Sequence, residues 1–271
     1  MPWTKLKNII LLILILTNLC LLGLVVSQNL QDSRQHSQTR ESTIRFLSDR
    51  GVQVDEAVIP QSIDLLVQTV ERDLEEEKAA AERLLQGEVE TEARGGEVYR
   101  YYNSKGSVQF HSDGTFLAQM EPGVYPVGED READCAAALE AVSFEGILLE
   151  ETEERLVFRK IWNQVPLFGQ NVTVICTQGS VSEISGEHRI LSHPKADLTQ
   201  HTISVPTALV RFLNGVSALG DVCNRIDRIE PGYLCSASLS GSMTMTPVWQ
   251  VTTDVGIYQL DTTAGTVKRA E

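Results

Sequence analysis

Hydrophobic and polar positions divide the chain into one uninterrupted apolar run and a longer, patterned remainder. The run covers residues 9–26, carries no charge and contains two distinctly polar side chains, Thr17 and Asn18. As an α-helix it would be about 27 Å long, close to the roughly 30 Å of a bilayer core. A buried helix of a globular domain normally keeps a polar stripe, which this run lacks. The pattern therefore predicts a transmembrane anchor over residues 9–27, behind a cytoplasmic tail of residues 1–8.

Two kinds of cleavable N-terminal segment also contain an apolar run, the signal peptide and the lipoprotein signal. Lys5 and Lys7 could form the positive start of a signal peptide that ends at Ser27, but the run exceeds the usual ~7–15 apolar residues of such a segment. A lipoprotein signal ending at Cys20 is disfavoured by the bulky leucine before it. No acid precedes the run, and Asp32 is the first charge after it. This asymmetry favours a cytoplasmic N-terminus and an extracytoplasmic body.

The remainder alternates between helical and strand-like periodicities. Residues 28–60 predict a juxtamembrane helix, over residues 40–50, followed by a strand. Residues 61–128 predict a first α+β module, and residues 129–271 a second α+β region of one or two modules. In each module a helix precedes short antiparallel strands. The predicted fold class is α+β, with amphipathic helices packed on antiparallel sheets behind a single N-terminal transmembrane helix.

Capping residues locate the three main helices. Asp73, with Glu76 at the capping-box position, begins a helix that continues to about residue 86. A second helix is predicted over residues 130–142, and a third begins at Ser204, before a proline suited to the first turn. Strands are predicted at residues 98–102, 108–110, 116–118, 156–162, 165–168, 172–176, 180–184, 233–239, 243–252, 257–260 and 266–268, with turns at 150–154, 169–171 and 231–232.

Charge narrows the range of partners. The whole chain has a formal charge of −14, and residues 28–271 carry −16 because all 37 acidic residues lie there together with 21 of the 23 basic ones. An acidic body of this kind disfavours nucleic acid and anionic lipid as binding surfaces. The hydrophobic content of 42% is ordinary for a folded domain.

Cysteine spacing leaves the redox state open. Cys20 lies in the apolar run, and Cys135, Cys176, Cys223 and Cys235 are spread through the body. An even number of cysteines in the body permits disulfides, and Cys223 and Cys235 are the nearest pair in sequence. Apolar surroundings favour small buried thiols instead.

Reactive motifs are missing from the sequence. It contains no H-E-x-x-H pair, no G-x-S-x-G elbow, no Walker A loop and no G-x-G-x-x-G fingerprint. The acidic runs at residues 75–77 and 150–154 are interpreted as solvated surface, the first on a helix face and the second in a turn. The sequence therefore predicts no catalytic residue, no cofactor and no metal site, and a protein that is not an enzyme.

Thr17 and Asn18 lie near the middle of the apolar run. An unpaired amide in hydrocarbon is costly, and a hydrogen bond between membrane helices contributes roughly 0.6–2 kcal/mol. The two residues are therefore the predicted partner-binding site, through which the anchor would contact a membrane helix of another protein. In the alternative, Asn18 bonds locally within its own helix.

Several segments match one known pattern. Residues 1–10 form a short Trp/Lys leader that runs into the anchor, and residues 47–60 combine a helix end, a glycine, a strand and an Ile-Pro pair. Near the C-terminus follow residues 229–233, residues 246–251 and the turn at Gly265. Together these segments resemble the YycI family, relatives of YycH that regulate an essential cell-wall sensor kinase in Gram-positive bacteria.

The resemblance implies a single-pass membrane protein and a non-enzymatic regulator of a two-component system. Its implied partners are a sensor histidine kinase and a YycH-like protein, whose contacts would bias the kinase between signalling states. The strand-rich modules also resemble PepSY-type domains. The alternative function is a membrane-anchored extracytoplasmic binding module for cell-wall material or a protease. An extracellular hydrolase is disfavoured because no nucleophile–base set is found.

Overall fold

The computed structural model describes residues 42–62, 64–238 and 241–270, and strands dominate this part of the chain. Fifteen strands form one hydrogen-bonded sheet system. The α-helices are a short one at residues 42–49, α2 (Leu74–Leu84), α3 (Arg131–Ala141) and α4 (Val205–Ala218). The predicted fold class, an α+β body of helices on sheets behind a transmembrane helix, is therefore wrong, because the described body is predominantly β.

The predicted membrane segment cannot be compared with the structure. The tail at residues 1–8 and the anchor at residues 9–27, with Thr17 and Asn18, lie outside the described residues. Within the described ranges, no helix has both the length and the apolar character needed to cross a bilayer.

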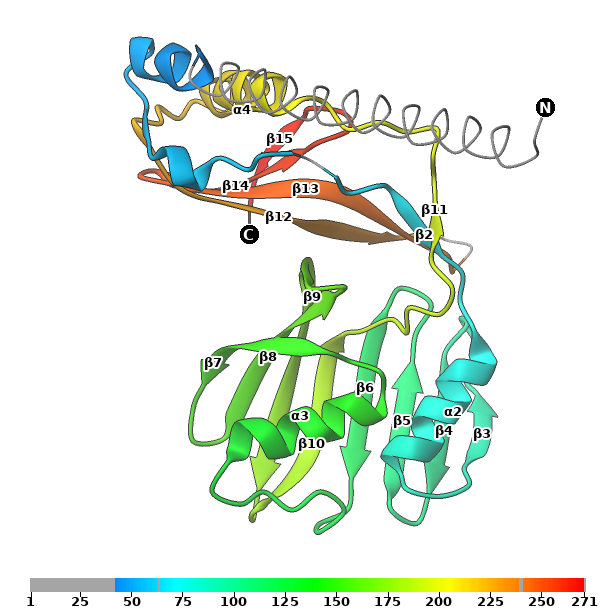
Figure 1. Ribbon diagram of the computed structural model, residues 1–271. Helices are drawn as coiled ribbons and strands as arrows, with labels where there is room; N and C mark the ends of the chain where they lie inside the picture. The colour runs from blue at the N-terminus through cyan, green and yellow to red at the C-terminus, as the bar shows by residue number, and fades with distance from the viewer. Residues whose placement is uncertain (1–41, 63, 239–240, 271) are drawn as a thin grey trace, which may run out of the picture.

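The strands are arranged as two layers, of which the lower carries α2 and α3 on one face (Figure 1). Its spatial order is β3-β4-β5-β6-β10-β9-β8-β7. The bounds are Glu90–Ala93 (β3), Tyr99–Asn103 (β4), Gly106–Phe110 (β5), Thr115–Met120 (β6), Gly146–Glu151 (β7), Arg155–Trp162 (β8), Val165–Thr177 (β9) and Ser180–Glu187 (β10). A buried cluster that includes Leu84, Phe116, Leu139 and Phe158 fills the space between the helices and the strands.

The upper layer is built on two long antiparallel strands, β12 (Arg225–Ala237) and β13 (Met243–Thr253). Helix α4 and the helix at residues 42–49 lie over it (Figure 1). The other elements are β1 (Gln53–Val54), the 3-10 turn η1 (Glu56–Val58), β2 (Gln68–Val70), β11 (Lys195–Ala196), β14 (Gly256–Asp261) and β15 (Val267–Arg269). Phe212 of α4 packs into a buried cluster with Trp249 and Tyr258.

Strand β9 belongs to both layers. Near its start it pairs in parallel with β12, where Leu167 is opposite Tyr233, and from Val172 onward it pairs with β10. Gly169 lies between these two parts with a φ of +82°, a conformation that favours glycine. The turn predicted at residues 169–171 is therefore a bend within one long strand, and this bend lets β9 leave one layer and join the other.

The turn predicted at residues 231–232 is also wrong. Pro231 and Gly232 lie inside β12 and pair with β13. A Cβ atom at position 232 would lie 2.3 Å from the ring of Phe168 and 2.7 Å from the carbonyl oxygen of Pro166. Glycine is needed here because β9 approaches closely, which is a second use of glycine in strands besides turns.

Strands β3, β7 and β11 were not predicted from the sequence. Strand β3 is fully exposed, and β7 ends in Glu150 and Glu151, which pair with β8. The turn predicted at residues 150–154 therefore starts only after these two residues. The charged strand β3 lacks the apolar alternation from which strands are predicted, whereas β7 carries apolar side chains, including Ile147 and Leu149, which are each 43% exposed.

The three main helices are confirmed at their predicted positions. The Asp73 carboxylate accepts hydrogen bonds from the backbone N–H groups of Glu75 and Glu76, at 3.0 and 3.2 Å. Asp130 caps α3 through its side chain in the same way. Ser204 is the N-cap residue of α4, but its side chain makes no capping hydrogen bond.

Candidate functional site

Buried charges gather where two chain segments connect the layers. Residues 71–73 lead from β2 into α2, and residues 188–194 return the chain from β10 to β11. A cavity of about 310 Å³ lies beside the returning segment. Its walls come from α2, the loop after α3, the end of β8 and the returning segment: Glu76, Ser143, Glu145, Lys160, Ile161, Trp162, Ile190, Leu191, Ser192 and His193.

Lys160 lies on the inner face of β8 and is 2% exposed. Leu156 and Phe158 point into the lower core, and the two-residue period of a strand places Lys160 on the same face. Its Nζ lies 2.5 Å from the carbonyl oxygen of Arg189 and 3.2 Å from Nδ1 of His188. Neither of these contacts carries a negative charge.

His188 is held as a neutral imidazole. Its Nε2 lies 2.8 Å from the carbonyl oxygen of Val142, which can only accept, so Nε2 carries the proton. Nδ1 is then free to accept a hydrogen bond from Lys160. Burial lowers the pKa of His188 well below its ordinary value, and the charge of Lys160 lowers it further. The rings of Phe116 and Phe144 enclose the imidazole, each with its centroid 5.4 Å away.

The protonation of Lys160 is sensitive to its surroundings. Burial lowers the pKa of Lys160 to about 7, and the Cys235 thiol on β12 opposes this only in part. The cause is loss of hydration, which disfavours the ammonium form in an apolar interior. A negative group placed beside the amine would favour the ammonium again. Lys160 contributes to the cavity wall, so an anion bound beside its amine would raise its pKa again.

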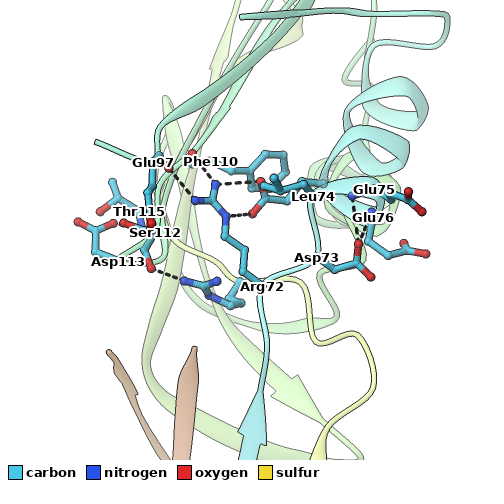
Figure 2. A network of polar contacts seen from close by, with 12 residues as sticks. Arg72, Asp73, Leu74, Glu75, Glu76, Glu97, Phe110, Ser112, Asp113 and Thr115 are labelled. Atoms are coloured by element: carbon cyan, nitrogen blue, oxygen red, sulfur yellow. Dashed lines mark hydrogen bonds and ion pairs between the residues drawn. The ribbon is translucent and has the colours of Figure 1, made fainter. Parts of the chain in front are cut away.

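Arg72 and Glu77 form a buried ion pair at the other connecting segment. Figure 2 shows the guanidinium of Arg72 between this segment and the turn and strand that carry Glu97 and Phe110. Arg72 Nε and Nη2 donate to the two carboxylate oxygens of Glu77, at 2.7 and 2.9 Å. The same guanidinium donates to the carbonyl oxygens of Glu97, at 2.6 Å, and Phe110, at 3.1 Å. Burial raises the pKa of Glu77, and its bonds to Arg72 oppose the rise. The pair joins the start of α2 to the strands beneath it.

Arg189 lies beside this ion pair and is 4% exposed. Its Nη2 donates to the carbonyl oxygen of Ser112, whereas Nη1 is buried and has no hydrogen-bond partner within the described ranges. Burial and the neighbouring Arg72 lower the pKa of Arg189, and Glu77 and Asp113 oppose that change. Arg189 thus has acids near it, in contrast to Lys160.

The cavity offers a ligand both polar groups and an apolar wall. Hydroxyls come from Ser143 and Ser192, and an imidazole comes from His193. The indole of Trp162 also packs against Tyr233 of β12, with ring centroids 5.9 Å apart. The wall of the cavity therefore contacts the upper layer. In the part of the chain that the structure describes, no three His, Cys, Asp or Glu side chains are placed to hold a metal ion.

The residues that the sequence predicts as a binding site are not the residues that form the buried site in the structure. Thr17 and Asn18 lie outside the described residues. The interpretation of residues 75–77 as a solvated face is wrong for Glu77, which is 6% exposed. Lys160 and Arg189 were not singled out from the sequence, although a lysine at an inward position of an alternating strand was a signal for the first of them.

Comparisons with known proteins identify no family for this chain. No family model matches the chain, and no curated protein matches it. One solved structure to which it is similar is an uncharacterized protein from Eubacterium rectale ATCC 33656. That likeness has 11% sequence identity and a TM-score of 0.44, and it covers 76% of this chain and 86% of the other. It is too distant to carry an argument about fold or function.

Within the described residues no helix could span a membrane, so the structure there gives no support to the term transmembrane helix. No family model and no curated protein matches the chain, so the comparisons give no support to the YycI family or to a two-component system. The implied partners, a sensor histidine kinase and a YycH-like protein, and the extracytoplasmic location are tested by none of these findings. They stay predictions.

Proposed function

We propose that this chain is a non-enzymatic binding module whose cavity takes a small ligand or peptide end with a free carboxylate. The observation that supports this is Lys160, a residue of the cavity wall whose buried amine has two contacts, both uncharged. A buried ammonium without an anion is unfavourable. A ligand carboxylate would supply the missing negative charge.

The size and lining of the cavity restrict the ligand further. A volume of about 310 Å³ is at the small end of the usual range for ligand sites. Trp162 and Ile190 offer apolar contacts, and Ser143 and Ser192 offer hydroxyls for amide groups. This combination suits the end of a short peptide, with one apolar side chain and one or two amides.

Two acids near the same cavity argue against a strongly anionic ligand. Glu76 and Glu145 both contribute to its walls. A ligand with several negative charges would be repelled by them, and repulsion of the wrong ligand is a common source of specificity. The proposal is therefore a ligand with one carboxylate, which Lys160 binds.

The test compares a small acid with its uncharged analogue. Binding of N-acetyl-alanyl-alanine and of its C-terminal amide to the full chain is measured by isothermal titration calorimetry. We expect the acid to bind at least about 10-fold more tightly, because an ionic hydrogen bond contributes roughly 1.5–3 kcal/mol. Binding of the acid should also take up protons at neutral pH, since it restores the charge on Lys160.

Two matched lysine variants distinguish binding in the cavity from binding to surface charges. Lys160→Met should abolish the preference for the acid, whereas Lys195→Met, a change of an exposed lysine on β11, should leave it unchanged. Equal affinity for the acid and the amide in the unmodified chain would refute the proposal. So would a preference that survives in Lys160→Met.

A further inference from the structure

Two cysteines from distant parts of the lower layer meet in space. Cys135 lies on α3 and Cys176 on β9, and their Sγ atoms are 3.6 Å apart. Both are free thiols in this structure, Cys135 buried and Cys176 partly exposed. They are not the pair nearest in sequence, which is Cys223 and Cys235.

From this contact we propose that Cys135 and Cys176 form a reversible disulfide that joins α3 to β9. A disulfide requires an S–S separation of about 2.05 Å and Cβ atoms roughly 3.5–4.5 Å apart. The two Sγ atoms are 3.6 Å apart, so a bond requires them to approach by about 1.5 Å, a distance that side-chain rotation about χ1 can supply. The site is therefore a modification site, and its co-reactant is a low-molecular-mass disulfide.

The other two thiols of the body are placed differently. The Sγ of Cys223 lies 3.5 Å from the carbonyl oxygen of Arg225 and packs in the core of the upper layer. Cys235 packs at the junction, in a separate cluster. These two cysteines serve as internal controls for the pair on α3 and β9.

The reaction proceeds by two thiol–disulfide exchanges. Cys176 loses its proton, its sulfur attacks a small disulfide such as oxidised glutathione, and one glutathione thiolate leaves. Cys135 then loses its proton and attacks the sulfur of Cys176, and the second glutathione leaves. The two protons end on the two glutathiones, so the protein loses two electrons and the small disulfide gains them. Burial raises the pKa of Cys135 to about 12, so the more exposed Cys176 reacts first.

The bond would close a covalent loop around much of the cavity. The segment between the two cysteines contains β7, β8 and almost all of β9. It also supplies Ser143, Glu145, Lys160 and Trp162 to the cavity wall. The disulfide would therefore stabilise the folded arrangement of this segment beside α3, because it reduces the conformational freedom of the unfolded chain. The inference rests on the sulfur contact alone and does not depend on the proposed ligand.

The experiment uses the full chain with Cys20→Ser, which removes the thiol of the N-terminal run. The protein is equilibrated with oxidised glutathione, free thiols are alkylated after unfolding, and peptides are mapped by mass spectrometry without reduction. We expect one cross-link, between Cys135 and Cys176, with Cys223 and Cys235 alkylated. The Tm should rise on the order of 5–10 °C and fall back on reduction.

Variants show whether the pair causes the shift. Cys135→Ser with Cys176→Ser should abolish the rise in Tm after the same treatment, whereas Cys223→Ser with Cys235→Ser should keep it. Four alkylated cysteines, or a cross-link that includes a different cysteine, would overturn the assignment. A cross-link between Cys135 and Cys176 that leaves the Tm unchanged would overturn its role in joining α3 to β9.

Discussion

The Nζ atom of Lys160 lies 3.2 Å from Nδ1 of His188, and the opposite ring nitrogen lies 2.8 Å from the carbonyl oxygen of Val142. Because a carbonyl can only accept, the imidazole donates at one end and accepts from Lys160 at the other. The histidine therefore holds the amine by hydrogen bonding without neutralising its charge. A buried amine held in this way keeps its position in the cavity wall whether or not it is protonated.

Replacement of Lys160 should change how stability depends on pH. Lysine in the unfolded chain keeps its proton to a pH of about 10.4, whereas burial in the folded chain lowers the pKa of Lys160 to about 7. Between these values the unfolded state binds more protons, so the free energy of unfolding rises with pH. Relative to Lys160→Met, the unmodified protein should gain about 2–3 kcal/mol between roughly pH 7 and pH 9.

Urea unfolding of both proteins at the two pH values measures this gain. Lys78→Met changes a lysine on α2 that is 50% exposed, and its difference from the unmodified protein should be the same at both pH values. A constant difference for Lys160→Met as well would mean that Lys160 has an ordinary pKa in the folded chain.

Loss of the buried carboxylate at Glu77 should be strongly destabilising. Glu77→Gln leaves Arg72 without its charged partner inside the protein, and breaking a buried pair costs roughly 3–5 kcal/mol. On the same helix Glu82 pairs with Lys78 at 3.7 Å, with both side chains more than a third exposed. Glu82→Gln should therefore cost less than about 0.5 kcal/mol.

Chemical denaturation of the two variants at one pH measures the loss in the free energy of unfolding that each substitution causes. Equal losses for Glu77→Gln and Glu82→Gln would show that the pair of Arg72 and Glu77 is as weak as an exposed one. The contrast uses two glutamates of one helix, so a difference in helix propensity does not enter.

Local features of the fold could be predicted because their causes act within a few residues. Asp73 caps α2 through N–H groups two and three positions away, and the meander from β4 to β6 follows glycine-containing turns. Strand pairing between distant segments has no such local cause. The contact of Leu167 with Tyr233 joins the layers, and nothing in either sequence segment indicates the other. Most of the individual helices and strands were therefore predicted correctly, but the fold class was not.

The candidate site was missed for a related reason. A lysine in a strand is usually solvated, and only its alternation with Leu156 and Phe158 distinguishes Lys160 from the exposed lysines. The residues that make its burial tolerable, His188 and Arg189, come from a segment far along the chain. Glu77 looked like one member of an acidic run, whereas its partner Arg72 turns it inward.

Gly232 should be intolerant of substitution because of close packing. In Gly232→Ala the new methyl group would lie 2.3 Å from the ring of Phe168, and overpacking of this kind costs roughly 1–3 kcal/mol. At Gly87 a Cβ would meet its nearest atom at 3.7 Å, an ordinary contact. Gly87→Ala should therefore change stability by less than about 1 kcal/mol in either direction.

Thermal unfolding of the two alanine variants measures the difference. A similar Tm for both would show that β9 and β12 can separate at this position without loss. The pairing of Leu167 with Tyr233 would then be a weak contact rather than the junction that holds the two layers.

The two N-cap residues Asp73 and Ser204 should differ in their contributions to stability. The Asp73 carboxylate accepts from two backbone N–H groups at the start of α2, and loss of such a cap costs about 1 kcal/mol, with a range of roughly 0.5–2 kcal/mol. The hydroxyl of Ser204 instead contacts the hydroxyl of Thr207 at 2.9 Å and caps no N–H of α4. Asp73→Ala should therefore be more destabilising than Ser204→Ala in urea unfolding. Asp73→Asn keeps an acceptor oxygen, so it should recover most of the loss, and if it recovered none, the charge of Asp73 rather than its hydrogen bonds would be the stabilising feature.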